Sequence, residues 1–146
     1  MLRKIALLLT AVAAIACVVT GFRYVLASEF MPYHSQVVGS SWVQLDPRIQ
    51  AIVLGMLTII GASFIAAGLT QLWLLIPLRR TERWAAWASL TIALALWVPT
   101  QYVTVYLRTV EPAAETPVVP TAILIALFVL GSLCHFAVSY RARNEG

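Results

Sequence analysis

Charged residues are scarce in this chain of 146 residues, of which 11% are charged and 61% are hydrophobic. Soluble domains carry about 25% charged and about 45–50% apolar residues, so a water-soluble fold of this length would leave much apolar surface exposed. The net charge of +4 does not indicate nucleic-acid binding, because no basic patch is interleaved with aromatic residues. The composition predicts a protein that resides among membrane lipids and has no nucleic-acid partner.

Several signatures of chemistry are missing as well. The chain has no glycine-rich phosphate loop, no H-E-x-x-H and no G-x-S-x-G. Its two cysteines, Cys17 and Cys134, form no zinc pattern, and we expect two free thiols because their predicted membrane depths differ by about 8 Å. Its two histidines, His34 and His135, fall on opposite sides of the topology given below, which argues against a shared metal site. No metal and no cofactor is predicted.

Four stretches lack acidic residues and are apolar for long enough to cross a bilayer, which takes about 20 residues. We expect helices at about residues 5–27, 49–78, 84–107 and 116–140, in a single transmembrane domain that covers residues 1–146. The absence of carboxylates from these stretches argues against a proton pump driven by such groups. The predicted fold class is all-α, an integral membrane four-helix bundle.

The charges that flank the predicted spans separate by side. One set of flanks holds seven basic and two acidic residues, namely Arg3, Lys4, Arg79, Arg80, Arg83, Arg141 and Arg143 with Glu82 and Glu145. The other set holds three basic and four acidic residues, namely Arg23, Arg48 and Arg108 with Glu29, Asp46, Glu111 and Glu115. Because basic flanks favour the cytoplasm, we expect both termini to be cytoplasmic and the loop at residues 28–48 to lie outside.

The first span has a second interpretation, as a secretory signal. Arg3 and Lys4 precede its apolar stretch, and the residues that end at Ala27 form a tolerable cleavage site. The residues that end at Cys17 also weakly resemble a lipoprotein box. The apolar run continues past Cys17 and is long for a signal core, so we favour an uncleaved helix.

Small residues recur along the second and third predicted helices, where they would let helix backbones approach each other in lipid. The pairs are Ala51 with Gly55, Ala62 with Ala66, Ser63 with Ala67, Gly61 with Gly68, Ala85 with Ser89, and Ala88 with Ala95. We interpret them as the seam between helices, and a substrate path lined by glycines is the alternative. Three polar side chains inside the spans, Gln71, Gln101 and His135, would either bond between helices or form a proton or ligand site.

The best candidate for a site lies toward the outer side. Pro99 removes a backbone donor from the third predicted helix, so this helix should kink there or its free carbonyl should find another donor. Near this point the topology gathers six candidate ligand-binding residues, which are His34, Tyr33, Trp42, Trp97, Gln101 and Tyr102. An aromatic belt at the outer membrane interface is the simpler interpretation of the same residues.

His34 follows Pro32 in a corner that proline should stiffen. A carboxylate of Glu29 or Asp46 would pair with its ring and raise its pKa. The alternative is structural, with a ring nitrogen that caps a chain end or bonds a loop carbonyl. In both cases we expect the ring to face Trp42 or the outer half of the third predicted helix.

One short motif carries a family resemblance. The stretch Phe30-Met31-Pro32-Tyr33-His34, followed by Trp42 and a glycine-bearing helix, resembles a family of uncharacterised bacterial four-helix inner-membrane proteins. The resemblance covers residues 28–86. It implies the fold and a multi-pass location in the inner membrane, and it implies no activity and no catalytic residue.

These observations lead to three functional hypotheses. The first is a non-enzymatic accessory subunit that assembles with itself or with a partner membrane subunit, which the small-residue seams favour. The second is binding or transport of a small apolar molecule or lipid at an outer-face aromatic pocket. The third is a membrane enzyme that uses His34 as an acid or base, helped by Glu29 or Asp46. The lack of a catalytic constellation makes the enzyme the least favoured of the three.

Overall fold

The computed structural model describes the backbone of residues 1–144 and the side chains through Arg141. Arg143 and Glu145, which the sequence assigns to the cytoplasmic flank, lie outside the described side chains. The elements follow in the order α1 (Leu2–Val25), α2 (Pro32–Val38), the 3₁₀ helix η1 (Trp42–Gln44), α3 (Pro47–Arg79), α4 (Arg83–Val110) and α5 (Val118–Asn144). The described part of the chain is all-α and contains no strand, as the sequence predicts.

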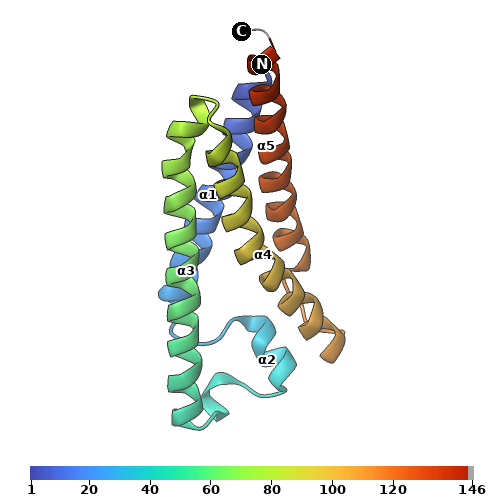
Figure 1. Cartoon of the computed structure of the whole chain (residues 1–146). Helices are drawn as coiled ribbons and strands as arrows, with labels where there is room; N and C mark the ends of the chain where they lie inside the picture. The colour runs from blue at the N-terminus through green and yellow to red at the C-terminus, as the bar shows by residue number, and fades with distance from the viewer. Residues whose placement is uncertain (145–146) are drawn as a thin grey trace.

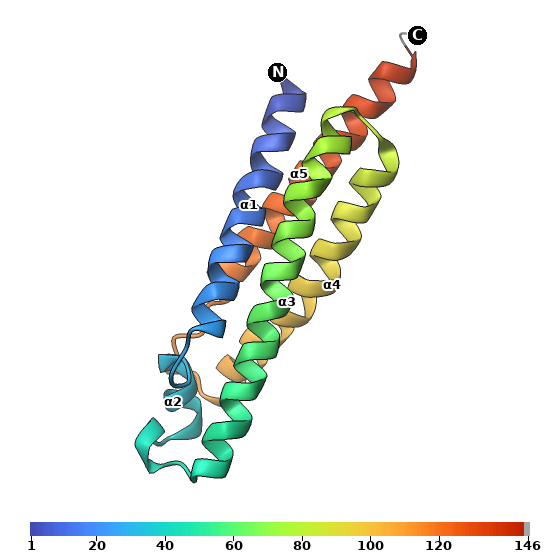
Figure 2. The ribbon, with the colours of Figure 1, turned by 90° about the vertical axis from the view of Figure 1, so that its left-hand side faces the viewer.

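Four of these helices, α1, α3, α4 and α5, are long and apolar enough to cross a membrane. They form an elongated bundle in which the two termini and the α3–α4 turn lie together at one end, called here the termini end (Figure 1). α2 lies at the opposite end, called here the α2 end (Figure 2). The chain is therefore a multi-pass membrane protein by the length and apolar character of its helices.

The connection at residues 28–48, which was predicted as a loop, contains α2 and η1. Pro32 starts α2 in the first helical turn, where a backbone N–H would have no acceptor within the helix. Gly39 ends the helix with a left-handed φ of 72°. Asp46 caps α3, because its Oδ1 accepts a hydrogen bond of 2.8 Å from the Arg48 N–H. The segment thus has defined start and end signals for α2 and a capping residue for α3.

α1 and α3 touch through their backbones. A Cβ atom added to Gly61 of α3 would lie 2.6 Å from the carbonyl oxygen of Gly21 on α1, and the reverse addition would lie 2.6 Å from the Gly61 oxygen. A Cβ atom on Gly68 would lie 2.8 Å from the Ala14 oxygen. Such contact maximises dispersion attraction between helices that lipid would otherwise solvate equally well. α1 also contributes buried residues to the core, including Ala13 and Cys17.

The seam predictions were correct in part. Gly61 and Gly68 of α3 and the pair Ala85 and Ser89 of α4 are buried, which confirms these positions. In the remaining pairs, Ala67 and Ala88 are partly buried and pack against the core, which agrees with the prediction for these two positions. The other members are exposed and form no seam within the chain: Ala51, Gly55, Ala62, Ser63, Ala66 and Ala95. Small residues occur on several faces of α3, and their spacing alone did not identify the face that packs against the other helices.

Polar groups join the helices near the termini end. The Gln71 side-chain amide donates to the Ser89 carbonyl at 2.8 Å, and the Ser89 hydroxyl donates to Gln71 Oε1 at 2.6 Å. This confirms the interhelix interpretation of Gln71 and holds α3 against α4. His135 is 3% exposed on α5, and its Nε2 has no partner among the described residues.

Away from the termini end, α3 and α4 separate. They are joined by a short turn, in which Thr81 has a positive φ of 60°, and they diverge toward the α2 end (Figure 1). α4 remains helical through Pro99 but bends outward in its second half, as expected where proline removes a helical hydrogen bond. This divergence leaves room between the helices at the α2 end.

Candidate ligand-binding cavity

The space between the diverging helices is a cavity of about 370 Å³, called here the α3–α4 lobe. Its walls are mainly apolar side chains of α3 and α4, and Tyr33 and His34 of α2 cover its end. Ile59 and Val103 line it from the two helices and are 69% and 49% exposed, so the lobe opens sideways onto the surface of the bundle. In a membrane such an opening faces lipid tails.

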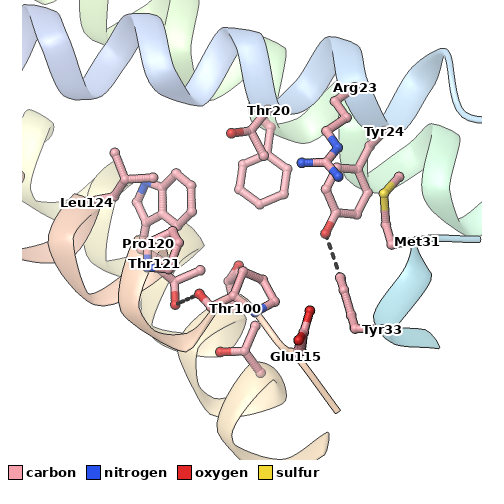
Figure 3. A pocket seen from close by; sticks show the side chains of 14 residues that line it. Thr20, Arg23, Tyr24, Met31, Tyr33, Thr100, Glu115, Pro120, Thr121 and Leu124 are labelled. Carbon is pink, nitrogen blue, oxygen red and sulfur yellow. Dashed lines mark hydrogen bonds between the residues drawn. The ribbon is translucent and has the colours of Figure 1, made fainter. Parts of the chain in front are cut away.

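A second cavity of about 270 Å³ lies on the other side, between α1, α4 and α5, and is called here the α1–α5 lobe. It is more polar than the first. Its polar lining comprises Thr20, Arg23, Thr100, Thr104, Glu115 and Thr121. Figure 3 shows Arg23 of α1 and Glu115 of the α4–α5 connection facing this lobe from opposite sides.

The two lobes meet at five residues that line both of them, namely Tyr24, Tyr33, Phe64, Thr100 and Thr104. The hydroxyls of Tyr24 and Tyr33 are hydrogen-bonded at 2.9 Å across the boundary (Figure 3). The ring of Phe64 lies 5.9 Å from that of Tyr24 and 5.0 Å from that of Trp97, which is 2% exposed. The candidate site thus consists of two adjacent lobes, called here together the two-lobed cavity, which share a wall formed by these five residues, called here the waist.

Tyr33 acts in this cavity as a neutral hydroxyl. Burial raises the pKa of its phenol, and the neighbouring Tyr24 raises it further. The hydroxyl therefore remains protonated across the physiological range and is able both to donate and to accept one hydrogen bond. A polar group of a ligand would meet hydrogen-bonding partners here instead of a negative charge.

His34 has the structural role that was one of its two predicted roles. Its Nδ1 accepts a hydrogen bond of 3.2 Å from the Met31 N–H at the start of α2, and its ring lies 4.2 Å from that of Tyr33. Burial lowers the pKa of His34, so the expectation of a raised pKa through Glu29 or Asp46 was wrong. The ring is neutral at pH 7 and lines the α3–α4 lobe.

The six predicted site residues divide evenly. Tyr33, His34 and Trp97 line the cavity, and Trp42, Gln101 and Tyr102 do not. The Trp42 ring packs edge-on against that of Phe30 at 5.1 Å. Gln101 accepts a hydrogen bond from the Thr121 hydroxyl between α4 and α5. Tyr102 is 68% exposed and stacks with Tyr106 at 6.2 Å, as an aromatic belt would.

Sequence reasoning missed Tyr24, Arg23, Thr100, Thr104 and Glu115. A signal for some of them was present, because Thr20 with Tyr24, and Thr100 with Thr104, are spaced four apart and so share a helix face. No periodic pattern indicates that these faces point at one another, since that depends on the divergence of α3 and α4.

The cysteines are free thiols, as predicted. Cys17 is buried against α3, and its sulfur lies 3.2 Å from the Phe64 carbonyl oxygen, to which it donates; Cys134 is partly buried on α5. Within the described residues, no cluster of three or more histidine, cysteine or acidic side chains is arranged to hold a metal ion. The arrangement of the cavity suits binding of an amphiphilic molecule by packing and hydrogen bonding.

Comparison with known proteins adds no identity to this description. No protein-family model matches the chain, and neither a curated protein nor a solved structure was found to be similar to it.

Proposed function

We propose that this protein binds an amphiphilic molecule taken sideways from the membrane. The observation that carries the proposal is the two-lobed cavity, because an apolar lobe with a lateral mouth lies beside a lobe lined by hydroxyls and charges. An apolar chain suits the first lobe and a polar head suits the second. Ligand sites commonly combine apolar walls with a few convergent polar groups in this way.

The orientation that accompanies this proposal places the termini end in the cytoplasm of a bacterial cell and the cavity in the outer half of the inner membrane. It rests on the excess of arginine and lysine in the flanks at the termini end. The resemblance over residues 28–86 supports the same location.

Single cysteines report this orientation directly. In a background without Cys17 and Cys134, we expect a cysteine at Ser40, after α2, to react with an impermeant maleimide in intact spheroplasts. A cysteine at Thr81, in the α3–α4 turn, should react only after the membrane is opened. Reaction of both positions from one side would contradict the four-span topology, and the reverse pattern would invert the orientation.

Self-assembly or an accessory role stays a prediction. Of the small residues that favoured it, Gly61 and Gly68 pack against the chain's own α1, whereas Ala51, Gly55, Ala62 and Ala66 of α3 are exposed. An enzymatic role for His34 has lost its proposed carboxylate partner and is not proposed further.

Native mass spectrometry tests the proposed function. The full chain is released from membranes in a mild detergent and measured without further addition of lipid. We expect the protein to carry one amphiphile of defined mass that survives activation longer than bulk lipid and detergent adducts do. A spectrum with only a statistical ladder of weakly held lipids would contradict the proposal.

A further inference from the structure

Two opposite charges line the α1–α5 lobe, Arg23 on α1 and Glu115 before α5. Both side chains are exposed where they line this lobe, and no hydrogen bond joins them (Figure 3). From the structure we infer that the polar head of the bound amphiphile is a zwitterion, with an anionic group on Arg23 and an ammonium group on Glu115. The inference rests on the proposed function and specifies its ligand class.

The backbones that carry these two charges contact neighbouring helices. Arg23 lies two residues after Gly21, where α1 is in direct backbone contact with α3. Glu115 is held through its backbone, because its N–H donates to Gln36 Oε1 of α2 at 2.8 Å, and the adjacent Ala114 is buried. The charged groups therefore project from a defined frame into one cavity.

The chemistry of the lining favours a ligand with both signs of charge. A guanidinium binds phosphate or carboxylate through a planar fork of donors, and a carboxylate accepts hydrogen bonds from a primary ammonium. The hydroxyl of Thr20 lies in the same lobe and supplies an additional hydrogen-bonding group. A purely anionic head would satisfy Arg23 but would meet the like charge of Glu115, and an uncharged head would satisfy neither.

Phosphate linked to a primary ammonium, as in phosphoethanolamine, is the simplest probe of this chemistry. Three lipids with identical acyl chains are titrated into the full chain in detergent: a phosphoethanolamine, a phosphoglycerol and a diacylglycerol. Native mass spectrometry reports the bound fraction of each. For the parent protein we expect roughly ten-fold tighter binding of phosphoethanolamine than of phosphoglycerol, which corresponds to about 1.4 kcal/mol.

The variants separate the two charges. Glu115→Gln should remove the preference for phosphoethanolamine while leaving phosphoglycerol binding intact or stronger, and Arg23→Gln should weaken both phospholipids by about ten-fold. Arg108→Gln and Glu29→Gln are matched controls, since these charges lie at the same end without lining the lobe. Unchanged melting temperatures in all four variants would show that the fold is intact.

The outcomes distinguish a failure of the proposed function from a failure of this inference. If the parent binds no lipid, the proposed function and this inference both fail. If it binds all three lipids equally, or if the preference survives Glu115→Gln, only the inference fails. Free O-phosphoethanolamine tests whether the zwitterionic group belongs to a lipid or to a soluble molecule. It should not displace the bound lipid if binding requires an acyl chain in the α3–α4 lobe. Displacement at micromolar concentration would assign the site to a soluble zwitterion and would overturn the membrane-lipid version.

Discussion

Replacing Gly61 with leucine is expected to prevent the bundle from assembling. A Cβ atom at this position would lie 2.6 Å from the backbone oxygen of Gly21, and backbone is unable to move aside as a flexible side chain does. α1 and α3 would have to separate along their length, at a cost at or beyond the upper end of the roughly 1–3 kcal/mol typical of overpacking. Size-exclusion chromatography and thermal unfolding in detergent measure the effect.

Gly55→Leu is the matched control for this substitution. Gly55 lies on the same helix, and a Cβ atom added there meets nothing within 4 Å. We expect its melting temperature to stay close to that of the parent, within the roughly ±0.5 kcal/mol usual for surface changes. Gly61→Leu should also lower the melting temperature more than Leu57→Ala does, although Leu57→Ala removes a buried side chain from the same helix. Equal stability of Gly61→Leu and the parent would contradict the α1–α3 contact.

Filling the waist of the cavity should abolish ligand binding with the fold intact. Thr100 lines both lobes, and phenylalanine in its place would project an aromatic ring into their junction. We expect Thr100→Phe to lose the copurified amphiphile by at least about ten-fold, or more than about 1.4 kcal/mol of binding free energy. Thr91→Phe, on an exposed position of the same helix, should retain it. Retention of the ligand by both variants would place its site elsewhere.

The helices were predictable from sequence because lipid imposes a simple rule of length and apolar character. Their observed bounds differ from the predicted ones by a few residues. α1 begins at Leu2 and not at residue 5, and α4 extends to Val110, because charged flanks such as Arg3 and Arg108 continue a helix beyond the apolar core. α2 was missed although Pro32 and Gly39 mark its ends, since seven residues are too few for a periodic pattern.

The site was harder to predict, for a physical reason. An aromatic residue at the outer end of a membrane helix serves equally well as an interfacial anchor or as a pocket wall, and the sequence contains both kinds. Trp97 and Tyr102 are five residues apart on α4, yet one is 2% exposed and the other 68%. What decides their roles is the rotation of α4 and its divergence from α3, which arise from packing among all four helices.

Tryptophan fluorescence tests directly whether membrane lipid occupies the cavity. The other four tryptophans are replaced by phenylalanine, so that only Trp97, 2% exposed beside Phe64, emits. The protein is then reconstituted with lipids whose acyl chains carry bromine, which quenches indole fluorescence at close range. We predict strong quenching of Trp97 and its loss when Thr100→Phe blocks the waist. Emission that bromine leaves unchanged, or quenching that persists equally in the blocked variant, would contradict the account.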